Sequence, residues 1–262
     1  MVNLNWPIKT TVDDTQAAQF IIQQIFRTTN FSINDIELQF YSQTNEDGII
    51  LYLFSKIGTV NKRFVEIGVG DGIECNTANL ILNHRWDGVL IDSHQSIESG
   101  ARFYTTCYRT RQRPPKIGRA WVTAENVNDL IGEVCELKGE VDLFSIDIDG
   151  MDYWVWKALS CISPRVAVIE CNSDLGPNAS VAVPYNPRFV WDQSSKNVGM
   201  SLMALVNLGR KKGYHLVGRN RYGFNAFFVR DDIDFPEMSV EDYFDGIPYD
   251  ESLLTRYEWE AV

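Results

Sequence analysis

Short apolar runs alternate with amphipathic segments through the middle of this chain. The apolar runs predict strands at residues 63–68, 88–92, 119–122, 141–147 and 166–171. Apolar positions at helical spacing predict helices at residues 74–83, 96–104, 126–135 and 153–159. This alternation is typical of an α/β, Rossmann-like fold, in which helices cover both faces of a mostly parallel sheet.

The pattern of hydrophobic and polar positions changes after residue 198. A helix is predicted at residues 199–212, and strands follow it at 214–218 and 224–230. The stretch NRYGF lies between these two strands and is typical of a hairpin. We therefore expect the parallel sheet to end in an antiparallel pair.

The chain divides into three predicted parts. Residues 1–57 are expected to form an N-terminal helical cap segment, with a helix after Asp13 or Asp14 and another at 50–57. Residues 58–230 contain the α/β pattern. Residues 231–262 are acidic and aromatic and predict a C-terminal tail or arm, which would suit a lid or a contact with a second copy in a homodimer.

Composition excludes several classes of function. The net charge of −11 argues against a nucleic-acid partner, because phosphate binding needs a basic surface. No apolar run approaches the roughly 20 residues of a membrane helix, and the N-terminus lacks a signal-peptide pattern. The five cysteines have no metal-ligand spacing, which argues against zinc and suits a reducing cytoplasm.

Residues 64–72, FVEIGVGDG, place an acid in an apolar strand and three glycines in the turn after it. Glycine lets the backbone turn sharply and approach a ligand, and ligands of parallel sheets bind at this edge. Glu66 and Asp71 disfavour a pyrophosphate, and the dinucleotide pattern GxGxxG is absent. A cationic adenosine ligand such as S-adenosylmethionine fits better, with Asp92 at the next strand end as the ribose acid.

Each of these residues also has a purely structural interpretation. Glu66 would pair with a nearby lysine or arginine, and the glycines would form an ordinary tight turn. Asp92 would cap the helix that follows it.

A second group of acids ends the fourth strand, within SIDIDGMDYWVW at residues 145–156. Asp147, Asp149 and Asp152 are crowded there, and like charges repel unless a cation, a proton or amides balance them. One interpretation is a divalent metal such as Mg²⁺ on Asp147 and Asp149. The others are a helix N-cap by Asp149 or Asp152, which we favour for at least one of them, and a catalytic base.

Two further residues are predicted at the same edge of the sheet. Glu170 lies in the apolar fifth strand and is therefore either paired or functional. His94 follows the second strand, where it is either a general base near neutral pH or an ordinary surface histidine.

Five motifs in order resemble FkbM-like methyltransferases and cover most of residues 40–230. They are YSQTNEDG (41–48), FVEIGVGDGIECNTANL (64–80), WDGVLID (86–92), LFSIDIDGMDYWVWKAL (143–159) and VIECN (168–172). The resemblance implies a class I S-adenosylmethionine-dependent methyltransferase with a seven-stranded sheet whose last strand is antiparallel. The chain departs from many relatives at residues 147–150, where DIDG replaces DxEG and the shorter Asp149 reaches less far.

The resemblance also implies a cofactor site and a specificity segment. Glu66, Gly68 and Gly70 would line the methionine end, and Asp92 would bind the ribose. The other residues implied to hold or cover the cofactor are Asn76, Thr77, Ser42, Gln43, Glu46 and Asp47. Residues 172–198 correspond to the part in which members of the family differ, so we expect a substrate-specificity insertion there.

The first functional hypothesis is methyl transfer to a hydroxyl oxygen of a natural product or sugar-like small molecule. A hydroxyl must lose its proton, and the candidate bases are Asp147, Asp149, His94 and Glu170, in that order. The alternatives are N-methylation of a small amine and a non-catalytic S-adenosylmethionine-binding protein. Aromatic residues are predicted to wall the acceptor pocket, with at least two of the five buried elsewhere: Tyr153, Trp154, Tyr185, Phe189 and Trp191.

Overall fold

The computed structural model describes residues 14–262, and a seven-stranded sheet of order β3-β2-β1-β4-β5-β8-β7 lies at its centre. The five strands that pair in parallel are β1 (Arg63–Ile67), β2 (Asp87–Asp92), β3 (Lys116–Arg119), β4 (Gly139–Ile146) and β5 (Ile162–Glu170). β8 (Asn225–Arg230) pairs antiparallel with both β5 and β7 (Tyr214–Arg219). This is the class I methyltransferase fold, and the predicted C-terminal hairpin is confirmed.

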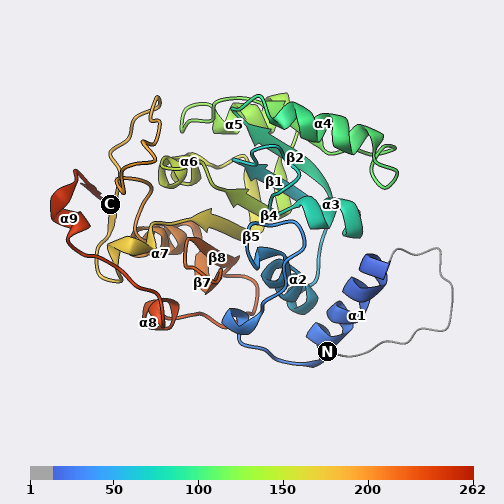
Figure 1. Ribbon diagram of the computed structural model, residues 1–262, viewed down its shortest axis with the longest axis horizontal. Helices are drawn as coiled ribbons and strands as arrows, with labels where there is room; N and C mark the ends of the chain where they lie inside the picture. The colour runs from blue at the N-terminus through green and yellow to red at the C-terminus, as the bar shows by residue number, and fades with distance from the viewer. Residues whose placement is uncertain (1–13) are drawn as a thin grey trace.

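Helices precede, connect and follow the strands (Figure 1). They are α1 (Asp14–Thr28), α2 (Glu46–Ile57), α3 (Ala78–His84), α4 (Ile97–Thr106), α5 (Val127–Asp129), α6 (Asp152–Ala158), α7 (Leu202–Lys212), α8 (Val240–Phe244) and α9 (Leu253–Arg256). α5 continues into a π-helical turn at Leu130–Val134. In the described part of the chain, no helix is both long and apolar enough to cross a membrane.

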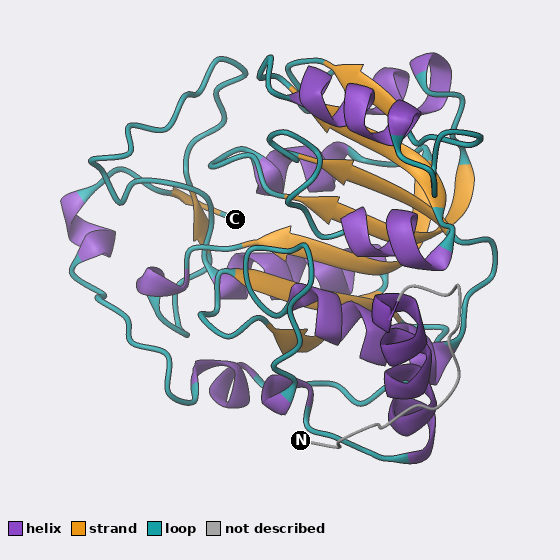
Figure 2. Cartoon of the chain, turned by 45° about the vertical axis from the view of Figure 1, so that its right-hand side comes forward, coloured by secondary structure: helices purple, strands orange, loops and turns teal. Residues whose placement is uncertain are grey.

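The sheet separates two hydrophobic cores. Side chains alternate along a strand, so Phe64 of β1 enters one core while Val65 and Ile67 enter the other. Helices α1 to α4 supply apolar residues to the first core, and α5 to α7 supply them to the second. Figure 2 shows the parallel strands pointing toward the side where the long loops gather.

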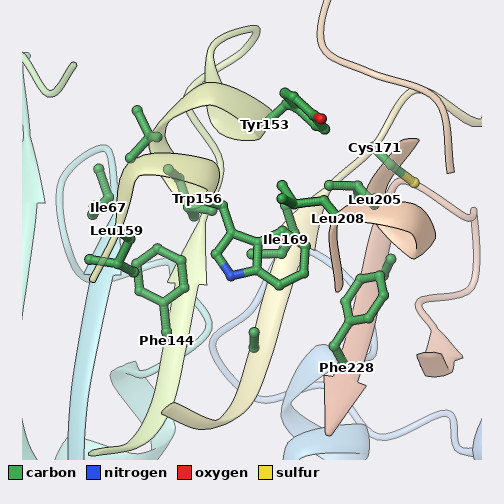
Figure 3. Close-up of a cluster of buried hydrophobic side chains, with 14 of the residues drawn as sticks. Ile67, Phe144, Tyr153, Trp156, Leu159, Ile169, Cys171, Leu205, Leu208 and Phe228 are labelled. Atoms are coloured by element: carbon green, nitrogen blue, oxygen red, sulfur yellow. The ribbon is translucent and has the colours of Figure 1, made fainter. Parts of the chain in front are cut away.

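Trp156 of α6 is fully buried in the second core. Figure 3 shows its ring among Phe144, Ile169 and Phe228, and its centroid lies 5.2 Å from that of Phe228. Truncating a buried tryptophan costs about 3–5 kcal/mol, so this ring holds α6 firmly on the sheet. The acidic loop that precedes α6 is thereby fixed at the carboxyl edge.

The third predicted strand and the starts of three helices are wrong by a few residues. α2 begins at Glu46 rather than at residue 50. β3 ends at Arg119, because its pairing with β2 finishes there and the Ala120 amide donates to the Asp92 carbonyl. α7 begins at Leu202 rather than 199, since the Ser201 side chain accepts the Ala204 amide as its N-cap.

α3 begins at Ala78 rather than at residue 74. The Asp71 carboxylate accepts the Ile73 amide, and the Glu66 carboxylate accepts the Asn76 amide. Those side-chain bonds hold residues 73–77 as a folded turn instead of a first helical turn.

The C-terminal residues pack on the body as an arm. β9 (Glu260–Ala261) pairs antiparallel with β6 (Val181–Ala182), within the segment 172–198 that was predicted to be a specificity insertion. Tyr243 is fully buried and donates from its hydroxyl to the Gly223 carbonyl at 2.9 Å. At the other end, α1 begins at Asp14, whereas Asp13 lies outside the described residues.

Candidate functional site

A cavity of ≈760 Å³ opens at the carboxyl ends of β1, β2, β4 and β5. Its walls come from the turns after these strands, from residues 120–123 after β3, and from the loop around residues 185–193. The sheet order reverses direction at β1, so the cavity lies at the topological switch point. Its volume is within the roughly 300–1,000 Å³ that is usual for small-molecule sites.

The glycine turn after β1 forms the floor of this cavity. Gly68 and Gly70 both have positive φ angles, of 82° and 59°. A Cβ atom on Gly68 would lie 1.6 Å from the Asp147 carbonyl oxygen. Only glycine at this position therefore leaves room for the backbone that follows β4. A Cβ on Gly70 would meet nothing within 4 Å, which leaves open space beside the cavity for a ligand.

Asp92 joins the end of β2 to the glycine turn. One of its carboxylate oxygens accepts the Gly70 amide at 2.7 Å, and the other accepts the His94 amide at 2.7 Å. The N-cap position of α4 is Ser96, so the helix-cap interpretation of Asp92 is wrong. Each Asp92 oxygen keeps a lone pair, and the residue lines the cavity, so both can accept ribose hydroxyls.

Glu66 is buried beneath the turn and pairs with neither lysine nor arginine among the described residues. Its carboxylate accepts the Asn76 amide at 2.8 Å, the Thr77 amide at 2.9 Å and the Thr77 hydroxyl. Burial raises the pKa of Glu66, and these hydrogen bonds oppose the rise. Glu66 and Asn76 line a second cavity of ≈30 Å³, which shares Gly68 and Asp147 with the large one.

The segment before α2 presents one residue to the cavity. Asp47 is buried and accepts the Phe40, Tyr41 and Ser42 amides, and Ser42 also donates from its hydroxyl to it. Gln43 lines both cavities, whereas Ser42 and Asp47 line neither. Asp47 and Ser42 therefore hold the backbone that carries Gln43.

All four predicted catalytic residues line the large cavity. Asp147, Asp149 and Glu170 each place a carboxylate oxygen within 4.8 Å of the others. Burial and the neighbouring Asp152 and Asp149 carboxylates raise the pKa of Asp147 to about 8. Burial and Asp147 raise the pKa of Glu170 well above its usual range.

Asp152 shapes the acidic loop instead of capping a helix. Its carboxylate accepts the Ile148 amide at 2.8 Å and the Gly150 amide at 3.0 Å, which both precede it in the chain. Met151 occupies the N-cap position of α6, so neither Asp149 nor Asp152 caps this helix and the favoured prediction is wrong. Burial raises the pKa of Asp152 to about 6.

His94 lies on the β2 side of the cavity, next to Asp92. It is exposed, and its Nδ1 lies 2.9 Å from the Ser96 hydroxyl. Asp147 and Glu170 come from β4 and β5 instead, on the other side of β1 in the sheet. The structure thus separates His94 from the acidic cluster by strand position.

Aromatic side chains close the cavity opposite the glycine turn. Tyr185, Phe189 and Trp191 line it, whereas Tyr153 and Trp154 do not. We expected at least two of the five to be buried elsewhere, but only Tyr153 is buried and Trp154 is partly exposed. Phe189 packs directly against Gly150, where a Cβ would lie 2.4 Å from the ring.

Sequence reasoning missed several lining residues, among them Trp121, Thr123 and Phe224. Trp121 was assigned to a strand, but it follows β3 and donates from its indole nitrogen to the Pro187 carbonyl at 2.8 Å. This bond ties the β3 side of the cavity to the aromatic loop. A signal was present, because residues after a strand of a parallel sheet face the ligand edge.

Comparison with known proteins adds little to this geometry. No protein-family model matches the chain, and the search of curated proteins found no match, so the FkbM-like assignment remains a prediction. Magnesium protoporphyrin IX methyltransferase from Synechocystis PCC 6803, solved with bound SAM, is 11% identical over 85% of this chain and 100% of its own, with a TM-score of 0.40. A putative caffeoyl-CoA O-methyltransferase from Staphylococcus aureus is 13% identical over 83% of this chain and 100% of its own, with a TM-score of 0.45.

We expect Asp147→Asn to stabilise the protein increasingly as pH rises. A carboxyl whose pKa is raised from 3.8 to about 8 keeps a proton that the unfolded chain releases, so wild-type stability falls between these two values. The asparagine variant lacks this loss and should melt higher than wild type at the alkaline end, by about 2–4 °C for each kcal/mol of stability that wild type loses. Thermal unfolding across this pH range measures the difference, and a constant offset at every pH contradicts the prediction. The exposed control Asp234→Asn should show no such trend.

Proposed function

We propose that the protein is an S-adenosylmethionine-dependent methyltransferase that acts on a small molecule. The observation that carries the proposal is the junction of Gly70 and Asp92 at the switch point of the sheet. There, an open glycine backbone and a carboxylate with free lone pairs lie beside a cavity of ≈760 Å³. These features fit a nucleoside whose ribose binds Asp92.

The cofactor would supply an activated methyl group on a sulfonium centre, and the chain would supply alignment and proton removal. Gly68, Gly70 and Gln43 would hold its methionine end, and Asp71 would add negative charge near its cation. Asp147 is the leading base, because a pKa of about 8 makes its ionised form, which grows as the pH approaches that value, a stronger proton acceptor than an ordinary carboxylate. The acceptor atom is a hydroxyl oxygen or an amine nitrogen.

Residues 172–198 would set the choice of acceptor, since Tyr185, Phe189 and Trp191 from this segment line the cavity. Asp147 and Asp149, with Glu170 as a third residue, also carry the oxygen ligands that Mg²⁺ prefers. Metal dependence is therefore part of the test.

Isothermal titration with S-adenosylhomocysteine, with and without Mg²⁺, tests the proposal. We expect micromolar binding to wild type and a loss of roughly tenfold or more in Asp92→Ala, which removes charge-assisted hydrogen bonds. Asp234→Ala is the matched control, because it removes an exposed aspartate and should bind like wild type. No binding to wild type under either condition contradicts the proposal. Binding without methyl transfer to any acceptor favours the non-catalytic alternative.

A further inference from the structure

Asp147, Asp149 and Glu170 line the cavity but lack the backbone or basic donors that the fully buried acids have. In residues 14–262 the buried acids accept bonds from backbone amides or side chains, and they are Glu46, Asp47, Glu66, Asp142 and Asp152. Among the same residues, no amide, lysine or arginine donates to the carboxylates of Asp147, Asp149 or Glu170. The Glu170 and Asp147 carboxyl groups hydrogen-bond to each other, which requires one of the two to carry a proton.

Glu170 carries the clearest sign of a missing partner. Its Oε2 is buried and has no hydrogen-bond partner, although the residue lines the cavity. Burying a carboxylate oxygen without a donor is unfavourable, so the site is complete only when a ligand brings one. A proton held between Asp147 and Glu170 can balance part of this cluster in the empty site, and a cationic ligand can take its place when the site is occupied.

The charge of the whole cavity disfavours a ligand with a net negative charge. Six carboxylates line it, and they belong to Asp71, Glu74, Asp92, Asp147, Asp149 and Glu170. No lysine or arginine of the described residues lines it. Asp71 and Asp92 already accept backbone amides, so the acids that lack backbone donors lie at the ends of β4 and β5.

The neighbours of the three acids are apolar and aromatic. Phe189 packs on Gly150, the residue after Asp149, and Met151 and Phe224 also line the cavity. Mg²⁺ usually keeps several bound waters, and apolar side chains offer those waters no hydrogen-bond partners. An organic ammonium group suits them, because aromatic faces attract cations and the same rings cover an apolar body.

We propose that the methyl acceptor is a small organic amine with an apolar body, whose ammonium group binds Asp147, Asp149 and Glu170. The inference rests on the proposed function for the methyl transfer itself. The positive charge of the ammonium favours release of the Asp147 proton to solvent, and the ionised carboxylate then takes a proton from the ammonium, which becomes a neutral amine. Its nitrogen lone pair then forms the bond to the methyl carbon, and the carbon–sulfur bond breaks with its electron pair remaining on sulfur.

The test measures binding of three probes of one shape to the full chain saturated with S-adenosylhomocysteine. Phenethylamine carries an ammonium, phenethyl alcohol is neutral, and phenylacetate is an anion. We expect the amine to bind at least about tenfold more tightly than the alcohol, and the anion not to bind, because charge-assisted hydrogen bonds are worth that much. EDTA should leave the amine affinity unchanged.

Two variants test whether the acidic residues bind the ammonium group of the amine. Glu170→Gln and the more exposed Asp149→Asn should each remove most of the preference for the amine while binding of S-adenosylhomocysteine is kept. Glu258→Gln is the matched control, since it removes an exposed glutamate in the C-terminal arm. Asp149→Asn keeps the test decisive if Glu170→Gln fails to fold.

Two results overturn the inference. One is an amine affinity no higher than that of the alcohol in protein that binds S-adenosylhomocysteine. The other is Mg²⁺ binding that depends on Glu170 and excludes the amine. Failure of S-adenosylhomocysteine to bind is a separate result, which overturns the proposed function, and the amine titration of the unloaded protein then still tests the cation site.

Discussion

Replacing Gly68 with alanine is expected to abolish cofactor-analogue binding. The new Cβ would lie 1.6 Å from the Asp147 carbonyl oxygen and 3.1 Å from the Ile148 side chain, so the backbone has to move. The φ angle of 82° adds strain for any residue other than glycine. Together these effects separate β1 from β4 at the floor of the cavity. We expect titration with S-adenosylhomocysteine to show a loss of roughly 100-fold or more.

Gly246→Ala is the matched control for this experiment. Gly246 has a φ angle of 73°, and a Cβ there would meet nothing within 4 Å, so the variant carries the strain without the clash. It lies in the C-terminal arm and should bind S-adenosylhomocysteine like wild type. Wild-type affinity in Gly68→Ala would mean that the ligand does not rest on the glycine turn. Circular dichroism of both variants separates a loss of binding from a loss of fold.

The parts of the site that the sequence predicted are those set by local signals. Gly68 and Gly70 follow a recognisable strand, and Asp92 ends the next one, so their meeting follows from the topology of a parallel sheet. Asp147 and Glu170 end neighbouring strands for the same reason, and they do lie together. The class I fold was likewise predictable from the alternation of strands and helices and from the final hairpin.

The parts that the sequence did not predict depend on contacts between distant residues. The partners of Glu66 are amides ten and eleven residues further along, which reach it only because the turn folds back. Trp121 joins the cavity because pairing with β2 ends β3 at Arg119, and no local pattern marks that point. Asp149 or Asp152 was expected to cap α6, but Met151 occupies the N-cap position and the Asp152 carboxylate accepts amides that precede it.

The largest loss of stability is expected from Asp142→Ala. The Asp142 side chain is fully buried on β4 and accepts the Val60, Asn61 and Lys62 amides at 2.6–3.1 Å. It also accepts the Arg165 guanidinium at 3.0 Å, in a pair whose arginine is only 9% exposed. Alanine leaves that charge and the three amides without their acceptor. Removing one partner of such a pair costs about 3–5 kcal/mol, which urea unfolding near neutral pH would measure.

The exposed ion pair of Asp87 with Arg113 provides the matched control. Its side chains are 34% and 75% exposed, so Asp87→Ala should cost no more than about 1 kcal/mol. Adding Arg165→Met to Asp142→Ala should restore part of the stability, because the uncompensated buried charge is then gone. Equal losses in Asp142→Ala and Asp87→Ala would show that the buried pair and its three amides do not anchor the loop before β1. The position of the glycine turn would then have to depend on the contacts of β1 with β2 and β4 alone.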